Sequence, residues 1–265
     1  MNAIPWTRFL LIAAICVAAT VNCVQPVSAQ YFGVFDAFSP LAWFPGVEGD
    51  VKARLVQVHI GSGSVSGPEG GSLAGTFHLN KDVWFIDSAV RFQLSRLSVR
   101  VAYEPREFSG FRPGFQTEAR FSYSGLRLGG DLDFIQCNRT RFGVDVDYDF
   151  FTPKFTYPTN ILPFPRVASG ANALTMGLHA TYNPLKTIFG VSGIIDARVR
   201  WPMTGTEVTD WEIDAGLASP STLLGSWAVK AGYRGTRLSF VDADVQDIRF
   251  ENILQGWFTE FAFYY

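Results

Sequence analysis

Apolar and polar residues alternate with a period of two along most of this chain. Between Arg141 and Phe150, the even-numbered positions hold Phe, Val, Val, Tyr and Phe, and the odd-numbered positions hold Arg, Gly and three Asp residues. Successive side chains of a β-strand point to opposite faces, so this pattern predicts a strand and fits no helix. The same alternation covers residues 51–60, 89–94, 97–104, 126–134, 174–182, 189–201, 211–217 and 227–234, and it is least regular in the first of these.

The connections between these segments differ in length. Short turns are predicted at 95–96, 137–139, 183–184 and 219–221, and long loops at about 61–86, 105–117, 152–170, 202–207 and 235–249. Short turns on one side and long loops on the other are typical of an up-and-down transmembrane barrel. The sequence therefore predicts an all-β, antiparallel barrel of about ten strands, with eight or twelve as alternatives, because bacterial single-chain barrels have an even number.

The last ten residues, GWFTEFAFYY, predict the strand that closes the barrel. Chain ends are usually solvated, so a terminus this apolar needs a partner. Its alternating aromatics and terminal Tyr resemble the C-terminal signal by which barrel-assembly machinery recognises outer-membrane proteins. That resemblance assigns the assembly signal to Trp257, Phe261, Phe263 and Tyr265.

The first 29 residues have the features of a secretory signal peptide. Arg8 precedes an apolar run from Phe9 to Val21, and small residues at 27–29 precede Gln30. The run is too short to serve as a spanning helix. We expect residues 30–265 to form one exported domain, with Cys137 as its only cysteine and hence no internal disulfide.

The composition of the chain limits the classes of molecule that it is expected to bind. The formal net charge is −2 and only 17% of the residues are charged, so no basic surface for nucleic acid is predicted. With 48% hydrophobic and 15% aromatic residues, the expected partners are outer-membrane lipid, the barrel-assembly machinery, and small solutes or ions. The expected location is the outer membrane of a Gram-negative bacterium.

The charged face of the strands is predicted to line the lumen. A soluble sandwich could also turn this face to water, but Trp and Tyr residues near the strand ends of the apolar face favour aromatic girdles at the membrane interfaces. Acidic and basic residues are nearly balanced, so we expect them to form ion pairs in a narrow interior. They are Arg91, Arg100, Glu104, Arg127, Asp131, Asp133, Arg141, Asp145, Asp147, Asp149, Asp196, Arg198, Arg200, Asp210, Glu212, Asp214, Lys230, Arg234 and Glu260.

Several stretches of the chain resemble a widespread group of small Gram-negative outer-membrane barrels, the porin-like or OmpA-type barrel superfamily. They are LNKD at 79–82, RFQLSRLSVRVAYEPREFSG at 91–110, GDLDFIQCNRTRFGVDVDYDFF at 130–151 and AGYR at 231–234. The resemblance implies the architecture and the outer-membrane location. It carries over no catalytic residue, because the shared stretches are features of the barrel itself.

One short stretch suggests catalysis. His179-Ala-Thr181 is similar to the His-x-Ser of lipid A deacylases, but Thr replaces Ser and no carboxylate follows at a comparable distance. We interpret both residues as ordinary polar residues of the lumen near a periplasmic turn, and we expect no enzyme.

Metal and phosphate sites are not predicted. His59 and His78 lie at the start and end of the first long loop, without nearby Cys or Asp partners in the sequence. Asp145, Asp147 and Asp149 could bind Ca²⁺, but same-face residues of a strand lie about 6.6–7 Å apart, which favours an ion-pair ladder with neighbouring Arg residues. The glycine-rich residues 61–71 have no Lys-Ser/Thr ending and predict a flexible extracellular loop. We expect no cofactor.

Function is left with three hypotheses. The first is a barrel that is structural or narrowly porin-like, with a salt-bridged lumen and long extracellular loops. The second is a surface protein whose loops bind a partner. The third is a rim enzyme acting on lipid.

Overall fold

The computed structural model describes residues 47–66, 71–80, 82–94, 96–137, 140–156, 158, 160, 166–168, 171–184, 191–220, 225–241 and 249–265. The predicted signal peptide at 1–29 lies outside these residues. In these ranges, no helix has the length and apolar character that a membrane span requires.

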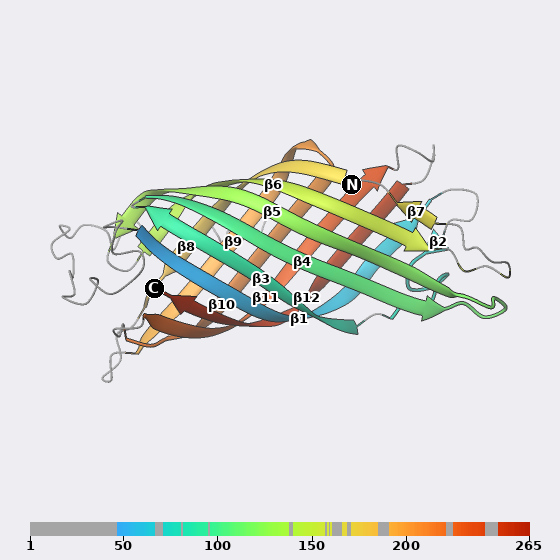
Figure 1. Ribbon diagram of the computed structural model, residues 1–265, viewed down its shortest axis with the longest axis horizontal. Helices are drawn as coiled ribbons and strands as arrows, with labels where there is room; N and C mark the ends of the chain where they lie inside the picture. Colours follow the sequence, from blue (N-terminus) through green and yellow to red (C-terminus); the bar gives the residue numbers. More distant parts are fainter. Residues whose placement is uncertain are drawn as a thin grey trace.

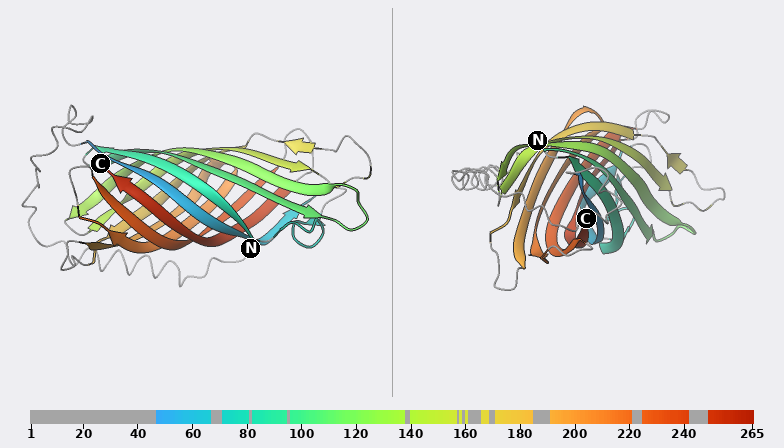
Figure 2. Two further views of the ribbon diagram at one scale, coloured as in Figure 1. Left: turned by 60° about the horizontal axis from the view of Figure 1, so that its bottom comes forward. Right: turned by 60° about the vertical axis from the view of Figure 1, so that its left-hand side comes forward.

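Long strands form one antiparallel barrel, and each strand is tilted relative to the long axis of the barrel (Figure 1). Each pairs with its neighbour in the chain, and the last pairs with the first, so the sheet curls round on itself (Figure 2). The prediction of an all-β, closed barrel with ten strands is confirmed. The strands are β1 (Val47–Val65), β3 (Asp82–Leu94), β4 (Leu97–Phe111), β5 (Glu118–Cys137), β6 (Thr140–Thr156), β8 (Ala171–Tyr182), β9 (Ser192–Gly205), β10 (Glu207–Ala218), β11 (Ser226–Val241) and β12 (Arg249–Tyr264).

Two short strands extend the sheet beside the barrel wall. β2 (Gly71–Ser72) pairs with the end of β1, and β7 (Arg166–Ala168) pairs with the end of β6. Both lie at the end of the barrel that carries the connections after β1 and β6. The opposite end carries the short turns after β3 and β5 and both ends of the described chain. Because outer-membrane barrels have short periplasmic turns, we assign this opposite end to the periplasm.

The C-terminal residues form the seam of the barrel. β12 lies between β11 and β1, so that Phe263 is opposite Trp227 on one side and Val51 on the other. The backbone N–H of Tyr265 donates to the carbonyl of Gly49 at 3.0 Å, and the N–H of Gly49 donates back at 3.1 Å. This pairing satisfies the backbone groups of two edges that would otherwise be exposed to lipid.

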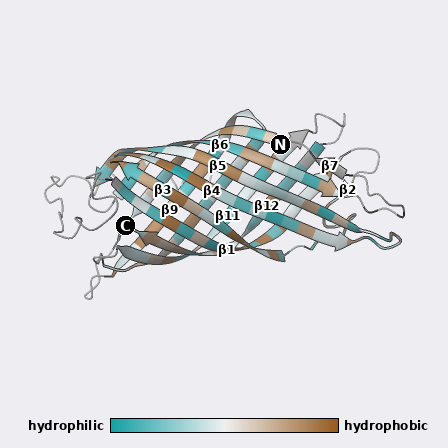
Figure 3. Ribbon diagram, in the orientation of Figure 1, coloured by the Kyte–Doolittle hydropathy of each residue, from teal (hydrophilic) through white to brown (hydrophobic). Residues whose placement is uncertain are grey.

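The outward face is apolar over the periplasmic half of the barrel, and bands of opposite hydropathy alternate along the strands (Figure 3). Exposed outward side chains there include Val101, Leu128, Val146, Val229 and Phe261. A closed sheet with an apolar outer band is the way in which strands cross a bilayer. The protein is therefore an outer-membrane β-barrel.

The strands continue beyond the membrane. A strand needs about 9–11 residues to cross a bilayer, whereas β1 has 19 residues and β5 has 20. On the outward face, Leu126 and Phe150 are exposed apolar neighbours, and the next outward pair towards the extracellular side is Ser124 and Thr152. A row of outward aromatic rings at Trp211, Tyr233 and Trp257, with centroids 5.5 and 4.9 Å apart, is placed as an interfacial girdle would be.

Exposed ion pairs lie on the outward face of this extension. Arg120 is 3.3 Å from Glu107 and 3.6 Å from Glu118, and all three side chains are more than half exposed. Such pairs fit water and would be costly in lipid. The extracellular ends of the strands thus form a water-exposed head above the membrane.

The inward face of the strands changes from charged to apolar where the outward face changes from apolar to polar. On β6 the inward residues are Asp145, Asp147 and Asp149 up to the membrane boundary, and Phe151 and Phe155 beyond it. The other strands contribute to the same apolar cluster inside the head, which contains Val56, Val58, Ile60, Val65, Leu73, Phe77, Leu79, Phe108, Ala119, Phe121, Tyr123, Ala171, Ala173, Val208, Leu238, Leu254 and Phe258.

Several predicted boundaries are wrong for one physical reason. Strands extend into the loops predicted at 105–117, 235–249 and 152–170, since β4 continues to Phe111, β11 to Val241 and β6 to Thr156. At the membrane boundary the inward positions change from charged to apolar and the outward positions from apolar to polar, so the lipid-facing pattern ends before the strand does. Likewise the first strand is longer than 51–60.

Two connections also differ from the prediction. The connection at 202–207 is a single residue, Thr206, after Gly205 with a φ of +85°. The positive φ suits a tight turn at glycine. Conversely, β8 ends at Tyr182 and β9 begins at Ser192, so these two strands are further apart in the chain than a turn at 183–184 alone would place them.

Deleting Phe263 to Tyr265 should prevent assembly. The truncation removes the backbone partners of Gly49 and Val51 and leaves part of two edges unpaired in lipid, at several kcal/mol for each unsatisfied group. We expect degradation or accumulation in the periplasm, measured by membrane fractionation and by the mobility difference between unheated and heated samples on a denaturing gel. Wild-type levels of the folded band would show that this seam is dispensable.

Candidate functional site

The charged residues predicted for the lumen all lie on the inward face of their strands. Thirteen of them are buried, namely Arg100, Arg127, Asp131, Asp133, Asp145, Asp147, Asp149, Arg200, Asp210, Asp214, Lys230, Arg234 and Glu260. The remaining members of that set are half-buried. Together they form an ion-pair network inside the membrane-spanning half of the barrel.

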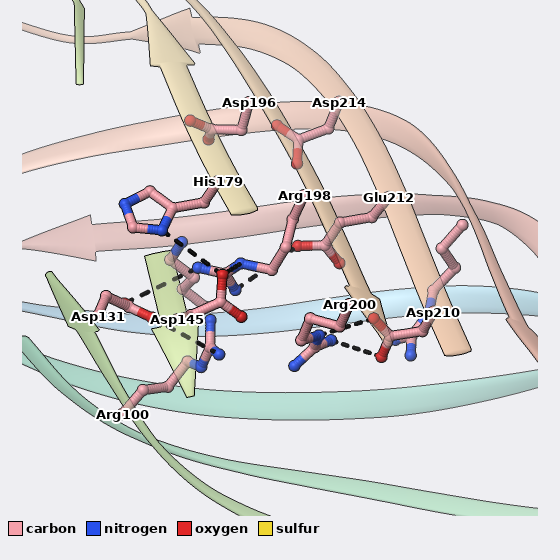
Figure 4. Close-up of polar contacts among 12 residues, drawn as sticks. Arg100, Asp131, Asp145, His179, Asp196, Arg198, Arg200, Asp210, Glu212 and Asp214 are labelled. Atoms are coloured by element: carbon pink, nitrogen blue, oxygen red, sulfur yellow. Dashed lines mark hydrogen bonds and ion pairs between the residues drawn. The ribbon is translucent and has the colours of Figure 1, made fainter. Parts of the chain in front are cut away.

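Asp147 is the centre of this network. Arg100 donates from Nη2 to both carboxylate oxygens at 2.8 Å, and Arg200 donates from Nη1 at 2.6 Å. Arg200 also holds Asp210 through two hydrogen bonds of 2.7 and 2.6 Å. Bidentate contacts of this kind fix geometry as well as charge. Figure 4 shows the Arg200–Asp210 pair beside the group formed by Arg100, Asp131 and Asp145.

Towards the extracellular side, a second group links opposite walls of the barrel. Arg127 contacts Asp149 at 2.5 Å and Asp210 at 3.0 Å. Arg234, on β11, donates to Glu104 on β4 at 2.8 Å and to Asp87 on β3 at 2.9 Å. Because β3 and β11 are not neighbours in the sheet, the second of these bonds crosses the lumen.

Near the periplasmic end, Lys230 is surrounded by carboxylates. Its Nζ is 2.5 Å from Asp196, 2.9 Å from Glu260 and 3.5 Å from Asp214. Arg54 bridges Glu260 and Glu212, the latter at 2.8 Å. Lys230 and Glu260 are fully buried, so their charges are compensated by these contacts and not by bulk water.

The network includes inward residues that the sequence pattern did not identify. Asp50, Lys52 and Arg54 come from β1, the strand with the least regular alternation, and Arg106 and Asp87 pair with each other in a buried contact. Arg106 lies within a region predicted as loop. The alternation of β4 continues through Pro105, so the phase of that strand was the signal that would have found it.

His179 lies in the lumen but is not an isolated polar residue. Its Nε2 is 2.8 Å from Asp133 Oδ1, and its Nδ1 is 3.6 Å from Asp145 Oδ1. The structure also brings Asp82 to within 3.0 Å of His59, at an exposed position where the sequence suggested no acidic partner. In both cases the partner comes from another strand.

The interior of the head is closed by aromatic side chains, which the alternation of polar and apolar residues does not predict. The rings of Phe77 and Phe155 lie 4.9 Å apart edge to face, and those of Phe108 and Phe121 lie 6.3 Å apart and stacked. Phe77 belongs to the connection between β1 and β3, predicted as a loop. Residues 71–80 of this connection fold onto the head and bury Leu73, Phe77 and Leu79.

A glycine creates the space for the centre of the network. A Cβ atom on Gly129 would lie 1.6 Å from Asp147 Oδ1, so this carboxylate occupies the position of the missing side chain. The next residue, Gly130, faces outward, and a Cβ atom there would lie at an ordinary 3.6 Å from the carbonyl oxygen of Ser98.

Comparison with known proteins supports no assignment beyond the fold. No family model matches the chain, and no curated protein matches it. Among solved structures it is similar to the outer membrane protease OmpT from Escherichia coli, with 11% identity, coverage of 83% of this chain and 97% of that one, and a TM-score of 0.46. It is also similar to the translocator domain of the autotransporter NalP from Neisseria meningitidis, with 11% identity, coverage of 97% and 95%, and a TM-score of 0.42.

A third similar structure is the beta domain of the Bordetella autotransporter BrkA, with 11% identity, coverage of 82% and 99%, and a TM-score of 0.43. Identities and TM-scores this low assign no activity to the chain. Its function has to be inferred from its own residues.

The substitution Gly129→Ala should destabilise the folded barrel, whereas Gly130→Ala should not. The first displaces Asp147 from Arg100 and Arg200, and breaking buried ion pairs costs about 3–5 kcal/mol. The second adds a methyl group towards lipid without a steric conflict. The midpoint temperature at which the folded band disappears on an unheated gel measures the difference. Equal midpoints for both variants would show that Asp147 does not stabilise the barrel.

Proposed function

We propose that the protein is a sealed structural barrel of the outer membrane that presents a folded head at the cell surface, and that it is not an open diffusion pore. The observation that carries this proposal is the filling of the lumen at two successive levels. Ion pairs fill the membrane-spanning level, and aromatic side chains fill the head.

At the membrane level, cross-lumen contacts oppose passage. A barrel of about ten strands has a narrow interior that side chains can span. Arg234 joins β11 to β3 and β4, and Arg127 joins β5 to β10. An ion that entered the membrane-spanning part of the lumen would have to separate a carboxylate from the arginine that neutralises it. Such a separation is unfavourable, because it leaves a buried charge unpaired.

In the head, an apolar layer and not a set of ion pairs opposes the passage of ions. Phe77, Phe108, Phe121 and Phe155 are fully buried against one another and against aliphatic residues. An apolar layer without compensating polar groups excludes hydrated ions because their desolvation is unfavourable. Loosening the ion-pair level alone should therefore leave the barrel closed.

Loop-mediated binding is the alternative that the head favours. The strands rise above the membrane around a packed core, and β1, β6 and β11 end there, where the connections that follow them begin. In this case the barrel would serve as an anchor and the connections would contact a surface partner. Catalysis is not proposed, since His179 hydrogen-bonds Asp133 within the lumen and both side chains are largely buried.

Conductance in planar bilayers tests the sealed state. We expect the refolded wild-type protein, and also Asp147→Asn, to show no steady single-channel current. The variant Asp147→Asn combined with Phe77→Ala and Phe155→Ala should conduct, because it perturbs both levels at once. Phe77→Ala with Phe155→Ala alone is the matched control, and it should conduct less than the combined variant.

Steady currents from the wild-type protein would contradict the sealed barrel and favour a narrow porin. Each sample must first show the mobility shift of a folded barrel on an unheated gel, so that leakage through unfolded protein is excluded. Capture of a surface partner that depends on residues of the head would favour the anchor alternative.

A further inference from the structure

Three side chains of the kinds that bind metal ions meet inside the periplasmic half of the barrel. They are Asp131 on β5, Asp145 on β6 and His179 on β8, three strands that lie side by side (Figure 4). One candidate ligand atom from each lies within 4.8 Å of the others. We propose that these residues bind a divalent transition-metal cation, with Zn²⁺ as the representative ion.

The hydrogen bond to Asp133 sets the orientation of the histidine. The Nε2 atom of His179 is 2.8 Å from Asp133 Oδ1, and a carboxylate accepts the hydrogen, so Nε2 keeps its hydrogen when the ring is in the neutral form that binds a metal ion. The Nδ1 atom is then free to coordinate and faces Asp145 at 3.6 Å. A carboxylate behind a metal-binding histidine is a common arrangement, because it fixes the ring and raises its basicity.

The candidate ligand atoms lack hydrogen-bond partners among the described residues. This holds for both oxygens of Asp145, for Oδ1 of Asp131 and for Nδ1 of His179. Asp145 is 0% exposed and Asp131 is 4% exposed. Buried carboxylates in proteins are nearly always hydrogen-bonded, since an unsatisfied buried charge is costly. A cation between these groups would supply the interactions that they lack.

The neighbouring arginines compensate this charge only in part. Arg198 is 3.8 Å from Asp131 and 3.9 Å from Asp145, which is longer than a hydrogen bond. Arg100 is 3.8 Å from Asp131 but gives its two short bonds to Asp147. Among the described residues, no Arg or Lys therefore lies at hydrogen-bonding distance from Asp131, Asp133 or Asp145, the three carboxylates around His179. Arg198 is the group that a metal ion would have to displace.

The donor set selects the class of ion. One imidazole nitrogen and two carboxylate oxygens suit zinc and related first-row ions, whereas Ca²⁺ and Mg²⁺ prefer oxygen ligands alone. Metal–ligand bonds of about 2.0–2.2 Å would require the three side chains to close by about 1 Å, which rotation about their χ angles can provide. Three protein ligands leave one position of a tetrahedral site for water.

The cluster lies close in the strands to the periplasmic mouth. Glu48 and Arg141 lie at this mouth, 3.6 Å apart, with side-chain exposures of 69% and 32%. Asp133 follows close behind on β5, a few residues before the turn to β6. An ion entering from the periplasm would thus meet carboxylates before it met the central network.

Titration of the refolded, chelator-treated full-length mature protein with Zn²⁺, followed by isothermal calorimetry, tests the site. We expect one ion per chain, with binding abolished in His179→Gln and Asp145→Asn. The Asp133→Asn variant should bind about 10–100-fold more weakly, because it loses only the group behind the histidine. The Arg198→Gln variant should bind more tightly, since the competing cation is removed.

His59→Gln is the matched control, because His59 pairs with Asp82 at an exposed site that could bind zinc adventitiously. The proposal predicts that this variant retains the wild-type stoichiometry and affinity. Failure of folded wild-type protein to bind, or loss of binding in His59→Gln, would overturn it. If His179→Gln does not fold, Arg198→Gln decides: unchanged or weaker binding in that folded variant contradicts the site.

Discussion

The pairing of charges inside the membrane-spanning half of the barrel is the constraint on which the remaining structure depends. The wall of this half is a single sheet with lipid on its outer face, so every charged side chain of these strands has to point inward. Inside a narrow lumen the same charges have little bulk water. They are stable there because most of the cations contact two or more carboxylates, as Lys230 contacts Asp196, Asp214 and Glu260.

Above the membrane the outer face of the barrel meets water in place of lipid, and the polarity of the residues on both faces of the wall changes accordingly. Outward residues become polar at Ser124 and Thr152, and inward residues become apolar at Tyr123 and Phe151. The head is thus organised like a water-soluble barrel, with its apolar core inside. The two halves share the same strands and the same hydrogen-bonded register, so continuous strands support an ion-pair core and an apolar core in series.

Local alternation was sufficient to predict the barrel, its closing strand and the inward face of the charged strands. Each depends on residues that are neighbours in one strand, such as Asp145 and Val146. The length of the strands was not predicted, because the exchange of polarity at Asp149-Phe150-Phe151-Thr152 looks like the end of a strand when lipid is assumed on one face throughout. Two adjacent apolar residues within a regular alternation were the available signal for that exchange.

Contacts between strands could not be derived from the sequence. The partners of His179 lie on β5 and β6, and Asp133 is 46 residues away from it in the sequence. Which carboxylates it meets depends on strand register, which the hydrophobic pattern restricts but turn geometry and bulges set. The bulge in β5 between Asp133 and Ile135 is one such determinant. The packing of Phe77 into the head likewise requires the path of a connection that has no repeating pattern.

The level at which the barrel wall leaves the lipid is the most direct test of this account. Nitroxide labels attached in the Cys137→Ser background to cysteine at Leu126 or at Ser124 would be compared in vesicles by their relaxation with oxygen and with a water-soluble nickel chelate. The account predicts that the label at 126 responds to oxygen, which concentrates in lipid, and that the label at 124 responds to the nickel chelate. Equal response of both labels to oxygen would place the polar residues of the head in lipid and contradict the exchange of polarity at this boundary.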